Sequence, residues 1–149
     1  MRKRACISLL AMSFLVSMLT VAPASAKSLG SLRAQIPFDF NVGERLVSAG
    51  NYTVSSMTGD DAVLRINGKG GDAMVMARQL RAKANRTERA RLIFHKYGDQ
   101  YFLAAVWGDE QAGSALAESK RERNLRKERR VARNNGGGAG VEIVTIDLR

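Results

Sequence analysis

The stretch LIFHKYGDQYFLAAVW, residues 92–107, decides the fold of this 149-residue chain. Two runs rich in aromatic and branched residues flank Gly98-Asp99, and glycine readily takes the positive φ that a type II′ turn requires at its first central position. The pattern therefore predicts an antiparallel hairpin. The expected pairs are Tyr97 with Gln100, Lys96 with Tyr101, His95 with Phe102, Phe94 with Leu103 and Ile93 with Ala104. Both faces carry apolar side chains, which favours a central place in a sheet.

A second strand signal lies earlier in the chain, at 36–42, where apolar residues alternate with others. This period of two is typical of a strand with one buried face. The residues expected in the core are Ile36, Phe38, Phe40 and Val42. Pro37 falls on the outward-facing set and cannot donate a hydrogen bond to a neighbouring strand. The strand is therefore predicted to lie at a sheet edge or to begin there.

Turn residues separate three further β-type runs between these two signals. The predicted strands lie at 52–55, 62–66 and 73–77, and a polar loop is expected at 81–89. Three methionines, Met57, Met74 and Met76, are expected to fill the core rather than line a ligand pocket. Strands at this spacing predict a mainly β fold, a small antiparallel β-sandwich or barrel with one exposed basic C-terminal helix.

The helix is predicted at about 114–134, where the composition favours helix and Ser114 can serve as the N-cap. Asn134-Asn135-Gly136 supplies the stop. A glycine-rich link at 136–140 follows, and 141–148 returns to strand character. Val144, Ile146 and Leu148 are expected to face the core, which would return this terminal strand to the β domain.

Most of the excess positive charge lies on the predicted helix. The segment 118–134 holds eight basic residues against three acidic ones. The candidate anionic-contact residues are Lys120, Arg121, Arg123, Arg126, Lys127, Arg129, Arg130 and Arg133. Either they contact an anionic envelope polymer or an acidic protein, or they only solvate the helix. Nucleic acid is not an expected partner, because no aromatic residues are interleaved for base stacking.

The N-terminus carries the pattern of a secretory signal peptide. Met1-Arg2-Lys3-Arg4 is followed by an apolar run from Ala5 to Val21 and by Ala24-Ser25-Ala26. Cleavage is expected near Ala26, which leaves a single β domain at 27–149 and places it in the periplasm or outside the cell. The alternative is an anchor that stays attached to the membrane. No other segment of the chain is apolar enough to cross a membrane.

Two parts of the chain resemble a known family. One part contains the pattern IPFxFxVG at 36–43 and the pattern AGxYxV at 49–54, and the other is the hairpin segment FHKYGDQYFL at 94–103 with its following ESKRER at 118–123. Together they resemble a family of small exported bacterial proteins of unknown function, found especially in acidobacteria. The resemblance implies a compact β domain with a trailing basic helix, and it carries over no catalytic residues.

The sequence offers little material for catalysis. His95 is the sole histidine, and its place in the hairpin favours a structural role. The expected mature chain has no cysteine, so no thiolate site is possible, and no metal or cofactor is predicted. Acidic residues at Asp60, Asp61 and Asp72 are interpreted as turn residues rather than as calcium ligands. A candidate ligand platform consists of Tyr97, Tyr101 and Trp107.

These observations favour an exported, non-catalytic binding or scaffold protein of the cell envelope, in which the basic helix contacts an anionic partner. An alternative is a small β-barrel that carries an apolar ligand in its interior. A third possibility is an enzyme that depends on carboxylates.

Overall fold

The structure is a computed structural model, which describes residues 29–81, 89–108, 112–134, 136 and 140–148. The expected signal peptide, the first residues of the expected mature chain and most of the glycine-rich link lie outside this part. So does the centre of the loop expected at 81–89. No helix within the described ranges combines the length and apolar character needed to cross a membrane.

The described residues form ten strands and one helix. Their bounds are β1 (Ser31–Ile36), β2 (Phe40–Val42), β3 (Arg45–Val47), β4 (Gly50–Ser56), β5 (Val63–Gly68), β6 (Gly71–Arg81), β7 (Arg91–Tyr97), β8 (Gln100–Trp107), β9 (Ala112–Leu116), α2 (Lys120–Asn134) and β10 (Glu142–Asp147). The three strands predicted at 52–55, 62–66 and 73–77 correspond to β4, β5 and β6. The short strands β3 and β9 were not predicted, and neither was the part of β1 that precedes Ile36.

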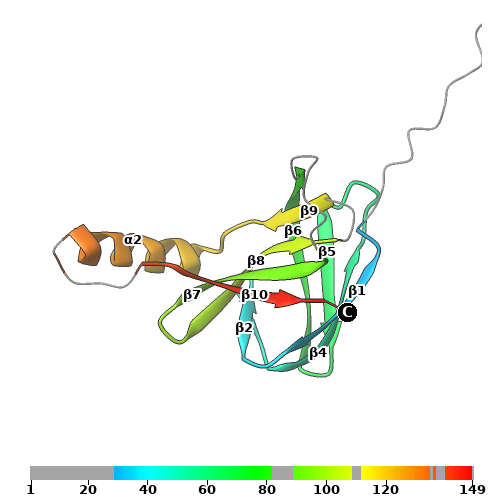
Figure 1. Ribbon diagram of the computed structural model, residues 1–149, viewed down its shortest axis with the longest axis horizontal. Helices are drawn as coiled ribbons and strands as arrows, with labels where there is room; N and C mark the ends of the chain where they lie inside the picture. The colour runs from blue at the N-terminus through cyan, green and yellow to red at the C-terminus, as the bar shows by residue number, and fades with distance from the viewer. Residues whose placement is uncertain (1–28, 82–88, 109–111, 135, 137–139, 149) are drawn as a thin grey trace, which may run out of the picture.

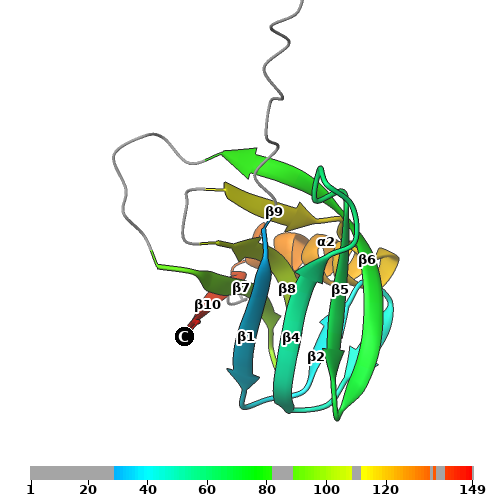
Figure 2. The same ribbon diagram turned by 90° about the vertical axis from the view of Figure 1, so that its right-hand side faces the viewer.

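All ten strands belong to one strongly bent sheet that folds into two layers (Figures 1 and 2). The first layer contains β1, β4, β5 and the first half of β6. The second layer begins with the second half of β6, which pairs with β9, and β9 pairs in turn with β8. Strand β8 also pairs with β7, which pairs with β10. It pairs as well with β2, which pairs with β3. The long strand β6 is thus shared by both layers.

The sheet does not close into a barrel, so the mainly β, sandwich-like alternative of the predicted fold class is confirmed. Within the described ranges β1 pairs with β4 alone and β10 with β7 alone, which leaves both at sheet edges. Pairing is antiparallel throughout, except that Phe40 and Asn41 of β2 run parallel to Tyr101 and Phe102 of β8.

The β7–β8 hairpin follows the predicted register over its first four pairs, from Tyr97 opposite Gln100 to Phe94 opposite Leu103. The fifth prediction was wrong, because a bulge leaves Ala104 out of the pairing and Ile93 faces Ala105. Gly98 has a φ of 64° and Asp99 is not in the left-handed region, as a type II′ turn requires. The hairpin is central, since β8 also pairs with β9 and β2 and β7 also pairs with β10.

The core lies between the two layers. The predicted core residues Ile36, Phe40 and Val42 are at most 2% exposed, and Phe38 packs against them while partly buried. The prediction of one strand through all four was wrong. The chain instead leaves the edge strand β1 after Ile36 and enters β2 at Phe40, because Pro37 has no N–H with which to continue a ladder.

The C-terminal segment differs from its prediction at one end. Residues Ala112–Leu116 form β9 and not the start of the helix. Helix α2 begins later than predicted, at Lys120, and ends at Asn134 as predicted. The terminal strand β10 pairs with β7 along its whole length. Val144 and Ile146 pack on the core and Leu148 is buried, as the alternation predicted.

Candidate functional site

Helix α2 begins at Ser119-Lys120-Arg121-Glu122, which has the sequence pattern of a capping box. The Ser119 hydroxyl accepts a hydrogen bond of 3.0 Å from the backbone N–H of Glu122, which satisfies one of the free donors of the first turn. The Lys120 N–H donates to the Glu44 carboxylate at 2.6 Å. The N-cap is therefore Ser119, and the prediction of Ser114 was wrong. Ser114 lies fully buried in β9.

The helix is tied to the hairpin through the carboxylate of Glu122. This residue is 4% exposed and is the buried residue of α2. Its Oε1 lies 2.8 Å from Nδ1 of His95 on β7. In a capping box the glutamate commonly reaches back to the N-cap N–H. In this protein it reaches the sheet instead, so the first turn of the helix is fixed to the outer face of the hairpin.

Beneath this first turn lies a small second cluster, separate from the main core. Tyr97 and Phe102 are 2% and 1% exposed, and their rings meet edge to face at 5.7 Å. The Tyr97 hydroxyl is buried close to the Glu122 carboxylate, outside the geometry of a regular hydrogen bond. Burial, followed by the charges of Glu122 and Glu118, raises the pKa of Tyr97 to about 12. The surroundings of this hydroxyl therefore favour its neutral form.

The candidate anionic-contact residues are concentrated on the surface of α2. Seven of them are exposed and Arg129 is half-buried. Arg126 forms a 3.0 Å ion pair with Glu118. Within the described part of the chain, none of the other six exposed cations forms an ion pair with a carboxylate. Three of these six, Arg123, Lys127 and Arg130, share one side of the helix. Because they stand at positions i, i+4 and i+7, they form one row along the helix, which we call the basic row. The row lies on a different side of the helix from Glu122.

The candidate ligand platform is not assembled in the structure. Tyr97 lies buried under α2, whereas Tyr101 faces the other side of the hairpin and stacks on Phe38 with ring centroids 3.9 Å apart. Trp107 is at the far end of β8, where the Arg91 guanidinium lies 5.8 Å from its ring centroid. The three rings therefore offer no common surface, because residues 97 and 101 alternate across the strand pair.

The methionine prediction was wrong. Met57, Met74 and Met76 are 51%, 63% and 73% exposed. On β6 it is Ala73, Val75 and Ala77 that pack inward. Pairing with β5 sets the register and places Met74 opposite Arg65 on the outer face. None of the three lies in the core, and Met76 lines an open cavity of about 340 Å³ together with Ala77 and Leu116.

Of the acidic residues interpreted as turn residues, Asp60 lies in a turn and Asp61 in the bend that follows it, whereas Asp72 belongs to strand β6. Each of the three takes part in a hydrogen bond. Asp72 pairs with Arg65 at 2.8 Å, and this hydrogen bond lowers the pKa of Asp72. Asp60 accepts a hydrogen bond from the Ala62 N–H two residues on. Asp61 is 2% exposed, and both of its carboxylate oxygens lie 3.1 Å from the Leu29 N–H. Within the described ranges no three His, Cys, Asp or Glu side chains gather as a metal site would require.

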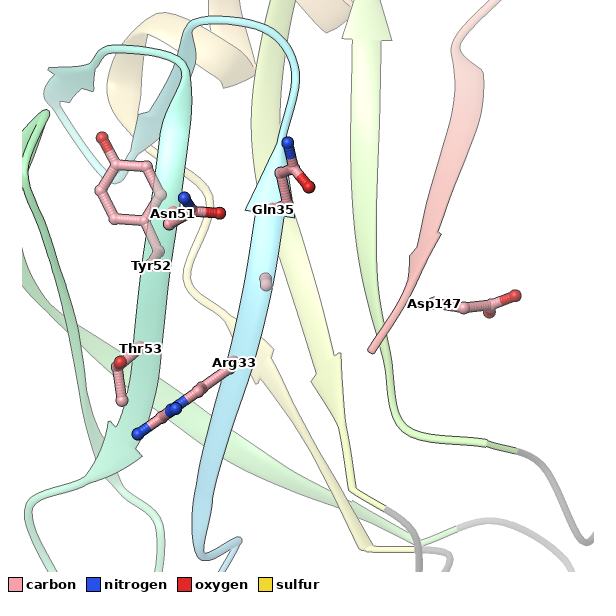
Figure 3. A pocket seen from close by; sticks show the side chains of 7 residues that line it. Arg33, Gln35, Asn51, Tyr52, Thr53 and Asp147 are labelled. Atoms are coloured by element: carbon pink, nitrogen blue, oxygen red, sulfur yellow. The ribbon is translucent and has the colours of Figure 1, made fainter. Parts of the chain in front are cut away.

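An open cavity of about 710 Å³ lies along the neighbouring strands β1 and β4, and β10 contributes one residue to its lining (Figure 3). Its lining is mostly polar and comes from Arg33, Ala34, Gln35, Asn51, Tyr52, Thr53 and Asp147. The space between the sheet layers is filled by side chains such as Leu64, Ile66 and Phe94, all of which are fully buried. An apolar ligand gains little from a polar, solvent-open lining. This cavity therefore lends no support to the alternative of an apolar carrier.

Comparison with protein-family models, with curated proteins and with solved structures gave no significant match for this chain.

Proposed function

We propose that the protein is an exported, non-catalytic binding protein of the cell envelope, and that helix α2 is its contact surface for an anionic partner. One observation carries this proposal. The helix buries Glu122 alone and exposes seven basic side chains. A helix that is polar nearly all round does not gain its stability from packing on its own sheet, and a partner is one reason to retain it. The signal-peptide pattern of the sequence supports export.

The acidic residues near the helix do not neutralise this surface. Glu118 pairs with Arg126, and Glu122 is buried against His95. Glu128 is the remaining acidic side chain of α2. The basic row therefore meets the solvent with a local excess of positive charge, which attracts anions over a range of roughly 8–10 Å at physiological ionic strength.

The chemistry of the row favours a polymer that carries phosphate or carboxylate groups. Guanidinium groups donate paired hydrogen bonds to such groups, and a row of cations matches a chain of repeated anions. Insertion into a bilayer fits less well. Val131 is exposed and Leu125 and Ala132 are half-buried, but these residues are scattered among charged ones, so the helix offers no continuous apolar face to lipid.

The test is retention of the purified protein on isolated cell envelopes across a salt series. The variant carries Arg123→Gln, Lys127→Gln and Arg130→Gln, which removes the basic row. A matched control carries Arg33→Gln, Lys69→Gln and Arg78→Gln, because these three exposed residues belong to the β domain and their loss removes the same charge. Both variants alter exposed side chains only, and each should keep its fold.

The wild type and the control should be retained at low salt and released as the salt concentration rises, whereas the row variant should lose at least about tenfold in retention at low salt. Equal loss in both variants would show that net charge, not the row, is responsible. Equal retention of all three proteins would refute the proposal.

A further inference from the structure

The attachment of α2 to the sheet depends on few contacts, and most of them are polar. The first turn holds the buried Glu122, the cap at Ser119 and the hydrogen bond from the Lys120 N–H to Glu44. Further along, Arg129 lies close to Gly98 at the tip of the hairpin, where an added Cβ would come within 2.8 Å of the guanidinium. An element held in this way can dock or release without breaking the main core.

We propose that His95 and Glu122 form a charge-dependent latch, which holds α2 on the β7–β8 hairpin and so regulates how the basic row is presented to its partner. The regulatory part rests on the proposed function. The latch itself does not, because it concerns the docking of the helix in the free protein.

The burial of Glu122 makes the docking of α2 sensitive to the charge of His95. Glu122 is 4% exposed, and a buried carboxylate is costly unless it has a charged or hydrogen-bonded partner. A protonated His95 supplies both a charge and a donor at 2.8 Å, whereas a neutral His95 supplies at most a donor. A hydrogen bond to an ionised carboxylate is already stronger than a neutral one, and a charge on His95 adds a Coulombic attraction to it. Docking is therefore strongest when His95 is protonated and Glu122 is ionised.

Other charged and titratable groups face the latch from each neighbouring element. On the helix side these are Glu118 and Arg126, which pair with each other, and Arg129. On β7, Tyr97 lies edge to face with the His95 ring at 6.4 Å, and its raised pKa keeps it neutral near physiological pH. Lys96 is occupied by Glu142 of β10 at 2.9 Å. Among these groups, His95 is the one of a type that ordinarily changes charge between about pH 5 and pH 8.

Loss of the charge on His95 reduces the ion pair to a hydrogen bond and weakens the docked state. Histidine as a residue type carries its charge in mildly acidic solution and not above neutral pH. Docking should therefore weaken as the pH rises through neutrality.

Hydrogen exchange of the free protein at about pH 6 and about pH 8.5, corrected for the intrinsic rate, tests the latch. The readout is the protection of amides from Leu125 to Ala132 relative to that of the β4 amides, which report the sheet. In the wild type this ratio should fall about fivefold to tenfold at the higher pH. In His95→Gln, which retains a donor without titrating, the ratio should not depend on pH. Lys96→Gln, a neighbouring charge removal on β7, should behave like the wild type.

An unchanged ratio in the wild type would overturn the latch, as would a pH dependence that persists in His95→Gln. Retained protection of β4 in each variant shows that the sheet is folded. Binding of dextran sulfate, a soluble polyanion, then tests the regulatory part. The dissociation constant should rise several-fold with pH in the wild type and remain constant in His95→Gln. If dextran sulfate does not bind at all, the proposed function fails while the exchange result still decides the latch.

Discussion

The sheet and the helix of this protein are held together by different kinds of interaction. The two sheet layers enclose side chains that are fully buried, such as Phe40, Leu64 and Phe94, and neighbouring strands are joined by long ladders. Helix α2 instead buries one carboxylate and exposes its cations. The difference teaches that stability and surface charge are carried by separate parts of the chain. The helix can therefore change its charge or its docking while the sheet stays folded.

The largest expected effect comes from opening the core. Phe94 is fully buried and contacts the rings of Phe38 and Phe40 edge to face at 5.3 and 5.6 Å. Phe94→Ala should lower the free energy of unfolding by about 3–5 kcal/mol, because it removes buried area and leaves a cavity. Val131→Ala on the exposed surface of α2 should change it by less than about 0.5 kcal/mol. Urea unfolding measures the free energy of unfolding of both variants. A similar loss in the two would contradict the idea that the sheet, and not the helix, carries the stability.

A smaller effect is expected at the cap of the helix. Ser119→Ala should destabilise α2 by about 1 kcal/mol, since the Glu122 N–H loses its acceptor. The matched control is Ser114→Ala, because the Ser114 hydroxyl is buried without a described partner and its removal breaks no hydrogen bond. Hydrogen exchange should show the loss of protection in α2 alone and only for Ser119→Ala. A larger effect of Ser114→Ala on the helix would contradict the assigned cap.

The smallest effect concerns an exposed ion pair of the sheet. Arg65 lowers the pKa of Asp72 through their hydrogen bond. A carboxyl group whose pKa is lower in the folded than in the unfolded state stabilises the fold above its unfolded pKa, and this contribution is lost as the pH falls through the folded value. The melting temperature of Asp72→Asn should therefore fall slightly less than that of the wild type as the pH is lowered. The side chains of the pair are 40% and 41% exposed, so the change should be small. A steeper decline in the variant would contradict this assignment.

The sequence predicted the elements whose local pattern and tertiary role agree. Alternation placed Phe40 and Val42 in the core, and the glycine of the hairpin turn fixed the first four pairs of β7 and β8. The bulge at Ala104 was not predictable, because two adjacent alanines give no signal for which one leaves the ladder. The break at Pro37 was signalled by the proline itself, but alternation through it suggested one continuous strand.

Three other features depended on partners distant in sequence. The segment Ala112–Leu116 has little intrinsic preference for strand, and pairing with β6 and β8 imposes it. On β6 apolar residues stand on both faces, so only the register with β5 decides that Met74 and Met76 point outward. The docking of Glu122 on His95 also required the fold. The N-cap at Ser119 could have been recognised from its Ser-x-x-Glu spacing.

The most direct test of the proposed contact surface is to map where an anion binds. Amide chemical shifts of the purified protein would be recorded during a titration with dextran sulfate at low salt, over all the described residues. We expect the changes to be confined to α2, to be largest around Arg123, Lys127 and Arg130, and to vanish as salt is added. Changes centred instead on the cavity along β1 and β4, or spread evenly over the exposed basic residues of the sheet, would contradict α2 as the contact surface.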